Sequence, residues 1–257
     1  MFTRLRCRDR VATQPMRAVA VVLALLSLLP AAVLAHGAPP LLDPEAPGLD
    51  GSQRLQALIE RVKDEQKKLR TLEADFVQHK NSALLAAPEE SRGTFSYQAP
   101  DRVRWEYDTP KAVTLLIRDQ EMTTWYRDLN RAERLNVGRY STQILRYMGA
   151  GGSIQDLLQY FSVSFAVAKD RREPYRLDLV PRYSRMTKRL KSISLWIDRQ
   201  RFLPVRLLYV EPDGDSTEYR FSNIRFNAGL PADRFDLQLP QNVEVRTLHL
   251  DHGAGPQ

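Results

Sequence analysis

Residues 93–110 read Gly-Thr-Phe-Ser-Tyr-Gln-Ala-Pro-Asp-Arg-Val-Arg-Trp-Glu-Tyr-Asp-Thr-Pro, and this stretch decides the fold. It predicts two β-strands joined by a Pro-Asp turn, because its side chains alternate in character from one residue to the next. The apolar face carries Phe95, Tyr97, Val103, Trp105 and Tyr107, and the opposite face carries Arg102, Arg104 and Glu106. A sheet with one aromatic face and one charged face must cover its aromatic face. The function depends on what covers it.

The first 35 residues have the pattern of a secretory signal peptide. Basic residues precede an apolar run from Ala18 to Leu29, and Val33-Leu-Ala35 supplies the small residues that signal peptidase requires. We therefore expect cleavage after Ala35 and export to the periplasm. This leader contains five arginines and one aspartate, so its removal lowers the net charge from +7 to +3. Such a mild excess of positive charge gives little support to nucleic-acid binding.

Behind the leader, the composition divides the chain into a linker, one domain and a tail. Residues 36–51 are rich in proline and glycine and predict a flexible linker, and 247–257 predict a loose C-terminal tail. The domain is expected over 52–246. It begins with an amphipathic helix, for which Ser52 is the expected N-cap.

The rest of the domain alternates mainly with the period of β-strands. Strands are predicted over 72–77, 93–98, 103–107, 113–118, 122–127, 131–137, 163–167, 175–179, 193–197, 203–209 and 217–226, and 230–245 closes the domain. About eleven strands in one mostly antiparallel sheet are too many to lie flat, so we expect the sheet to curl. Two short helices, over 142–148 and 153–161, are each apolar on one side. Since such short helices are unstable alone, we expect them to dock onto the concave side of the sheet.

The sequence contains no pattern typical of a catalytic or metal site. The only cysteine, Cys7, lies in the leader, so the exported chain has no thiol. His249 and His252 have ligand-like spacing, but their tail offers no supporting carboxylate or cysteine cluster. The glycine run at 149–152 lacks the Lys-Ser/Thr pair of a phosphate loop. We expect no enzyme activity, no cofactor and no metal.

A run of cations between two predicted strands permits two interpretations. Its members are Arg182, Arg185, Lys188, Arg189 and Lys191. A solvated loop that resists edge-to-edge aggregation is the simpler interpretation. A surface for anionic lipid head groups or an acidic partner is the alternative. The apolar interior also permits two interpretations. The curled sheet either packs against the helices without a ligand or holds a ligand.

Four stretches in order resemble the LolA family, the periplasmic carriers of outer-membrane lipoproteins. The first is Leu72-Glu-Ala-Asp-Phe-Val-Gln78, and the second is the hairpin from Gly93 to Tyr107. The third is Leu190-Lys-Ser-Ile-Ser-Leu-Trp-Ile-Asp198 with Leu203-Pro-Val205. The fourth is Phe221-Ser-Asn-Ile224 with Phe235 and Leu239-Pro240. The resemblance covers about 55–245, nearly all of the chain behind the leader.

The resemblance implies a mainly β fold with an α lid: an incomplete antiparallel β-barrel of about eleven strands around a hydrophobic cavity. It implies that acylated lipoproteins are carried from an inner-membrane lipoprotein-releasing ABC transporter to an outer-membrane receptor, by a monomer. Val103 and Trp105 match positions that face the cavity in the family. The family's basic residue before the hairpin proline, a lid latch, is replaced here by Ala99. Arg102 and Arg104 are the candidates to substitute for it.

On this basis we predict a cavity wall and a lid. The predicted wall consists of Phe95, Tyr97, Val103, Trp105, Tyr107, Leu115, Ile117, Leu195, Ile197, Val205 and Leu207. The predicted underside of the lid consists of Ile144, Leu145, Met148, Leu157, Leu158 and Phe161. Two alternatives remain: a lipid- or glycolipid-binding or sensing protein of the same fold in another envelope pathway, and an envelope enzyme or a dry structural barrel.

Overall fold

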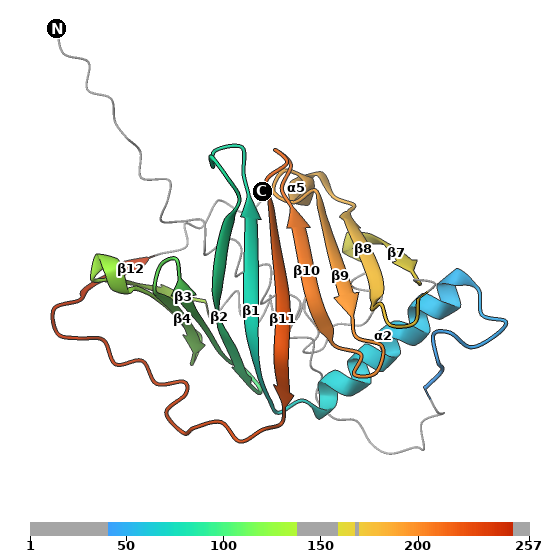
Figure 1. The fold of residues 1–257 in the computed structure, drawn as a ribbon, viewed down its shortest axis with the longest axis horizontal. Coiled ribbons are helices and arrows are strands. Elements are labelled where there is room, and N and C mark those ends of the chain that lie inside the picture. Colours follow the sequence, from blue (N-terminus) through green and yellow to red (C-terminus); the bar gives the residue numbers. More distant parts are fainter. Residues whose placement is uncertain (1–40, 138–158, 168–169, 249–257) are drawn as a thin grey trace, which may run out of the picture.

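The computed structural model describes residues 41–137, 159–167 and 170–248 (Figure 1). Its elements are α2 (Gly51–Lys68), β1 (Thr71–Asn81), β2 (Glu89–Gln98), β3 (Arg102–Thr109), β4 (Val113–Arg118), β5 (Glu121–Tyr126), the 3-10 helix η1 (Arg127–Leu129), β6 (Arg131–Asn136), β7 (Phe161–Ala166), β8 (Tyr175–Pro181), α5 (Ser184–Thr187), β9 (Ser192–Ile197), β10 (Pro204–Val210), β11 (Ser216–Phe226) and β12 (Glu244–Leu248). The predicted leader, the first short helix, most of the second and the last nine residues lie outside the described residues.

The strands form one 12-stranded sheet in the order β12-β6-β5-β4-β3-β2-β1-β11-β10-β9-β8-β7. Neighbouring strands are antiparallel except β12, which pairs in parallel with β6. The described strands do not close into a ring, because β12 and β7 lie at opposite edges. This confirms the predicted mainly β fold and the incomplete barrel. The parallel pair was not predicted; it arises because the chain after β11 crosses to the far edge of the sheet (Figure 1).

The hairpin of β2 and β3 places its apolar residues on one face, as predicted. Phe95 is opposite Trp105, and Tyr97 is opposite Val103, so the apolar residues share one face. The same alternation continues across β1 and β4, where Ala74 is opposite Phe95 and Leu115 is opposite Trp105. The hairpin therefore extends its aromatic face onto both neighbouring strands.

Ring contacts show that the sheet curls toward this apolar face. The strands β3 and β11 are separated by β2 and β1, so their backbones would be about 14 Å apart in a flat sheet. The rings of Trp105 on β3 and Tyr219 on β11 nevertheless have centroids only 5.5 Å apart. We call the apolar side the inner face and the charged side the outer face.

Helix α2 starts earlier than predicted and is anchored to a fixed segment. Its N-cap is Asp50 instead of Ser52, because the Asp50 carboxylate accepts the backbone N–H of Gln53 at 2.8 Å and the Gln53 side chain accepts the N–H of Asp50. Residues 41–50, which we expected in a flexible linker, are held by arginines of α2. Arg54 donates to the carbonyl oxygens of Pro44, Ala46 and Leu49, and Arg61 donates to those of Leu41 and Leu42.

One lid residue lies in a different element from the one we predicted. Phe161 was expected at the end of the second short helix, but it is the first residue of β7, where it pairs with Pro181 of β8. Its ring is half-buried and packs against the inner-face residues. None of the helices in the described residues is both long and apolar enough to cross a membrane.

Candidate functional site

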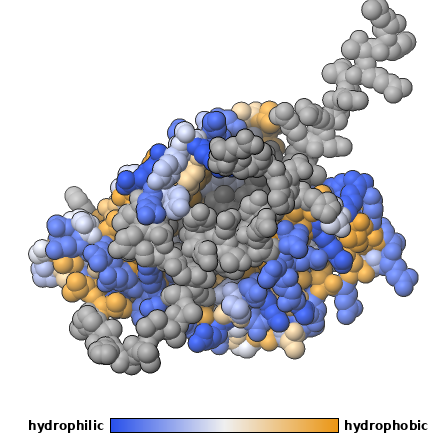
Figure 2. All heavy atoms as spheres, turned by 180° about the vertical axis from the view of Figure 1, so that it is seen from behind, coloured by the Kyte–Doolittle hydropathy of each residue, from blue (hydrophilic) through white to orange (hydrophobic). Residues whose placement is uncertain are grey.

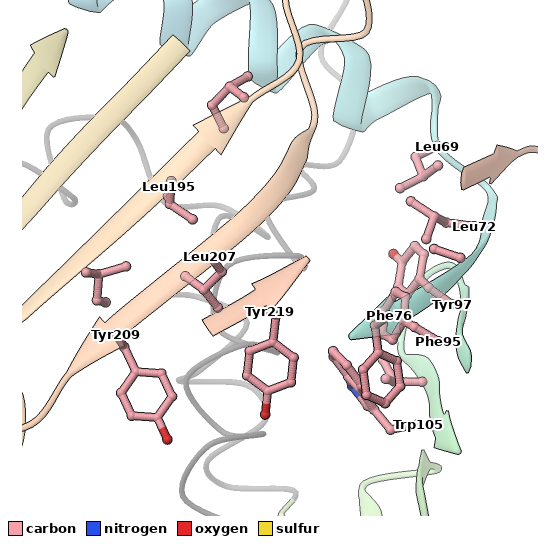
Figure 3. Packing of buried hydrophobic residues seen from close by; sticks show 14 of the residues in the cluster. Leu69, Leu72, Phe76, Phe95, Tyr97, Trp105, Leu195, Leu207, Tyr209 and Tyr219 are labelled. Carbon is pink, nitrogen blue, oxygen red and sulfur yellow. The ribbon is translucent and has the colours of Figure 1, made fainter. Parts of the chain in front are cut away.

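The centre of the inner face is a group of aromatic rings from four adjacent strands (Figure 3). Phe76 of β1 lies edge-on to Trp105, with ring centroids 4.9 Å apart, and Phe95 of β2 lies 4.7 Å from the same indole. Tyr107 of β3 and Tyr219 of β11 complete the group. Edge-to-face pairs of this kind add about 0.5–1.5 kcal/mol each beyond the burial of their surface. The rings therefore form a stable, preformed apolar wall.

The polar atoms of this group carry no charge. The hydroxyl groups of Tyr107 and Tyr219 are 3.4 Å apart. Burial raises the pKa of both phenols, so both stay protonated at physiological pH. The indole N–H of Trp105 is buried and has no hydrogen-bond partner among the described residues. The centre of the inner face is thus suited to a neutral, apolar ligand.

Aliphatic residues continue this surface on the other half of the sheet, and α2 packs on it. The flank is formed by Leu177, Leu179, Ile193, Leu195, Ile197, Leu207 and Tyr209. From α2 and the residue that ends it, Leu58, Val62 and Leu69 join the same cluster. A cavity of about 10 Å³ between α2 and the sheet is lined by Gln66, Leu69, Leu72, Phe95 and Phe221, among others. That space is about the minimum for a single water, so α2 and the strands around this cavity pack closely.

The structure brings ten of the eleven predicted wall residues to this face. Nine are buried in the cluster, and Ile117 is half-buried against it; the nine are Phe95, Tyr97, Val103, Trp105, Tyr107, Leu115, Leu195, Ile197 and Leu207. Val205 is half-buried and is not part of the cluster. The reason is an irregularity between Pro204 and Arg206, where the register of β10 shifts against β9 and strict alternation fails.

Several residues of the inner face were missing from the predicted wall, and three aromatic ones among them are indicated by the sequence. Phe76 follows the inward-pointing Leu72 and Ala74 of β1 at a spacing of two residues, so its side chain lies on the same face. Tyr219 likewise lies two residues after the buried Thr217 of β11 and on the same face. Tyr209, two residues beyond Leu207 on β10, is also buried in the cluster. The period of two would have identified all three, since the pattern was visible in strands that we predicted correctly.

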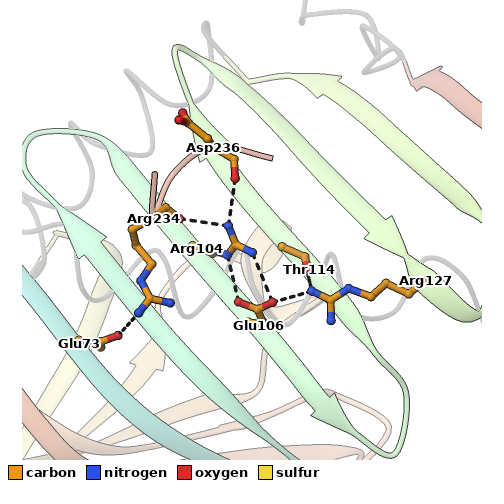
Figure 4. A network of polar contacts seen from close by, with 7 residues as sticks. All are labelled: Glu73, Arg104, Glu106, Thr114, Arg127, Arg234 and Asp236. Atoms are coloured by element: carbon orange, nitrogen blue, oxygen red, sulfur yellow. Dashed lines mark hydrogen bonds and ion pairs between the residues drawn. The ribbon is translucent and has the colours of Figure 1, made fainter. Parts of the chain in front are cut away.

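The outer face at the same strands carries a network of charges (Figure 4). Glu106 accepts hydrogen bonds from Arg104 and Arg127, and Arg127 also donates to the Thr114 hydroxyl at 2.8 Å. Burial alone would raise the pKa of Glu106, but the hydrogen bonds from Arg127 and Arg104 outweigh burial and lower that pKa. Glu106 is therefore ionised at neutral pH and joins β3 to the end of β5.

Arg104, one of the two residues predicted as a latch, belongs to the same network. Its guanidinium donates to the backbone carbonyls of Arg234 and Asp236 at 3.1 and 3.2 Å, so it fixes the segment between β11 and β12 (Figure 4). Arg234 in turn donates to Glu73 of β1 at 2.7 Å. All described partners of Arg104 lie on the outer face or in this segment. Arg102, the other candidate, is half-buried at the start of β3 opposite Gln98.

Comparison with known proteins identifies relatives over most of the chain. The model of the family described as outer membrane lipoprotein carrier protein LolA matches residues 67–238. An outer-membrane lipoprotein carrier protein of Pseudomonas entomophila is 25% identical over 180 residues, which are 69% of this chain and 82% of the relative. One from Coxiella burnetii is 26% identical over 180 residues, 68% of this chain and 80% of the relative.

Among solved structures, an uncharacterized conserved protein of Thermus thermophilus has a TM-score of 0.50 at 11% identity. The match covers 76% of this chain and 100% of that one, and it shows a shared fold alone. The family match begins at the end of α2 and includes every strand from β1 to β11, with the aromatic hairpin at its centre. The chain belongs to the LolA family.

Proposed function

We propose that this protein is a periplasmic carrier that binds the acyl chains of lipoproteins on its inner face and moves them from the inner to the outer membrane. The observation that carries the proposal is the continuous apolar face, which runs from Trp105 through Tyr219 to Leu207 on one side of an open, curled sheet. Membership of the LolA family and the predicted signal peptide support the same role. The carrier is proposed to act as a monomer without catalysis.

The physical need for such a carrier follows from the cost of exposing acyl chains to water. Each methylene costs about 0.8 kcal/mol, so a chain of sixteen carbons costs roughly 12 kcal/mol. A lipoprotein with several chains cannot cross an aqueous compartment unescorted. We propose that an inner-membrane ABC transporter loads the carrier and that an outer-membrane receptor, with higher affinity, unloads it.

Binding requires the inner face to separate from what packs on it. The cavity of about 10 Å³ beside α2 cannot take an acyl chain, and α2 contributes Leu58 and Val62 to the buried cluster. We propose that the lid residues predicted between Ile144 and Leu158, which lie outside the described residues, move aside with cargo binding. Phe161 at the start of β7 would then be at the border of the opened site.

A charge placed on the inner face tests the proposal. Ile117 is half-buried against the cluster, so Ile117→Glu puts a carboxylate beside the acyl chains without filling the fully buried centre. We expect at least about a tenfold loss of affinity for a fluorescent sixteen-carbon fatty acid, since burying an unpaired charge is costly. The matched control is Val77→Glu on the outer face, where the register places Arg92 and Arg220 alongside.

The control variant should bind the fatty acid as the wild type does, and circular dichroism should show that both variants are folded. Equal affinities of the wild type and Ile117→Glu, or equal losses in both variants, would exclude the inner face as the acyl site.

A second candidate function rests on the latch position. Ala99 stands where the resemblance predicts a basic residue, and Arg104 is engaged on the outer face. A paralogue that binds lipid or glycolipid in another envelope pathway is consistent with that difference. Depletion of the protein in its own host distinguishes the two functions: stranding of lipoproteins in the inner membrane supports the carrier, and normal lipoprotein sorting supports the second candidate.

A further inference from the structure

The loop around α5 carries exposed cations, none of which has an acidic partner in the part of the chain that the structure describes. Arg182, Arg185, Lys188, Arg189 and Lys191 are all exposed, and residues 182–191 include no carboxylate. Within the described residues, no ion pair involves any of the five. Arg182 uses its side chain to bind the carbonyl oxygen of Phe161 at 2.9 Å. No ion pair among the described residues therefore offsets the positive charge of this loop.

Many other arginines of the described surface are paired. On the outer face, Arg206 and Arg220 both bind Glu218, and Arg176 binds Asp178 at 2.9 Å. At the other edge of the sheet, Arg246 binds Glu244 at 2.7 Å. Arginines occur on all these surfaces. The α5 loop differs from the others because none of its cations is in a described ion pair.

The backbone of the loop is fixed, so its cations are presented on a defined support. The N–H of Lys191 donates to the carbonyl oxygen of Val210 at 2.8 Å, and the N–H of Arg182 donates to that of Tyr160 at 2.9 Å. Leu190 packs against the inner-face cluster. The loop is therefore anchored at both ends and by one apolar side chain.

The connection between β1 and β2 lies at the same end of the sheet as α5 (Figure 1). Tyr183 is 52% exposed beside the cations, and Leu84 is 82% exposed on the connection between β1 and β2. That connection is tied to the turn between β10 and β11, where the Asp215 carboxylate accepts the N–H of Ala83 at 3.1 Å. On the face that Figure 2 shows, hydrophilic and hydrophobic residues are interspersed over the described surface.

We propose that this end of the sheet is a docking surface for anionic phospholipid bilayers. Uncompensated cations attract an anionic surface, and exposed tyrosine and leucine side chains favour the boundary between head groups and acyl chains. An acidic protein partner would satisfy the cations but would not account for the exposed Tyr183 among them, or for Leu84 on the connection at the same end of the sheet. The proposal goes beyond carriage of acyl chains, because the surface lies outside the inner face and binds the membrane itself.

Co-sedimentation of the purified protein with vesicles tests the proposal. We expect binding to vesicles of equal parts phosphatidylglycerol and phosphatidylcholine, weakening at high salt, and no binding to phosphatidylcholine alone. The variant Arg185→Gln/Lys188→Gln/Arg189→Gln should lower the partition coefficient about a hundredfold, since each basic residue near an anionic surface contributes about a factor of five. Tyr183→Ser should weaken binding further.

The matched control removes the same charge elsewhere. Arg134, Arg172 and Arg246 are exposed and ion-paired, and their simultaneous change to Gln should leave vesicle binding within about threefold of wild type. Equal losses in both triple variants would show a net-charge effect and overturn the proposal. So would an absence of binding to anionic vesicles, or full binding by the α5-loop variant. A fatty-acid affinity that is unchanged in this variant separates the result from a failure of the acyl site.

Discussion

At the scale of single residues, Gly93 places the strictest demand on the central hairpin. A Cβ atom there would lie 1.8 Å from the carbonyl oxygen of Glu106 and 3.0 Å from the Phe76 ring. The clashing oxygen belongs to the backbone, which cannot move aside as the end of a flexible side chain can. We therefore expect Gly93→Ala to lower the free energy of unfolding by about 3 kcal/mol. Urea unfolding measures this difference.

The control for Gly93 is Gly51→Ala at the start of α2, where no atom lies within 4 Å of the added Cβ. Its stability should match or slightly exceed that of the wild type, because alanine is the better helix former. A Gly93→Ala protein as stable as the Gly51→Ala protein would show that β2 and β3 are farther apart than described.

Which side chains point inward could be predicted from the sequence wherever a strand is regular. The period of two placed Phe95, Trp105 and Leu115 correctly, because each strand exposes alternate side chains to one face. It failed at Val205, where a register shift interrupts β10. It could not assign Arg104 its partners either, because the carbonyls of Arg234 and Asp236 are about 130 residues away in the sequence.

At the scale of elements, the start of α2 depends on one capping carboxylate. Asp50 satisfies the N–H of Gln53, whereas Ser52 lies inside the helix. We expect Asp50→Ala to lower the free energy of unfolding by about 1 kcal/mol, and Ser52→Ala to change it by no more than a few tenths. Thermal and urea unfolding of the two variants decide between the caps; a larger loss for Ser52→Ala would place the helix start where the sequence alone suggested it.

Local sequence patterns therefore predict the type of an element well. They predict less well where it begins and ends, and which distant segments it pairs with. Strands and hairpins were predicted because alternation and turn residues are local. The parallel pairing of β12 with β6 was not, since it joins segments more than a hundred residues apart. The start of β7 at Phe161 was missed for a related reason: the apolar spacing before it fits a helix, and pairing with Pro181 of β8 decides the outcome.

At the scale of the whole molecule, the open sheet gives the protein one large apolar face, with β12 and β7 as the outermost of the described strands. Curling brings Trp105 and Tyr219 into contact across the intervening strands, while the segment through Arg234 and Asp236 is fastened to the outer face. We propose that the inner face can exchange its cover while the sheet persists, because the backbone hydrogen bonds that join neighbouring strands lie within the sheet itself. A carrier needs this combination, since it must hold its cargo and also release it.

The measurement that tests the carrier account most directly is native mass spectrometry, with lipid extraction, of the protein purified from the periplasm of its own host. We predict a bound lipoprotein that carries acyl chains, in one copy per monomer, which is lost or much reduced in Ile117→Glu and retained in Val77→Glu. Bound glycolipid or free phospholipid would support the second candidate function. A ligand-free protein that also fails to bind the fluorescent fatty acid would contradict the account, because the inner face would then be a dry core.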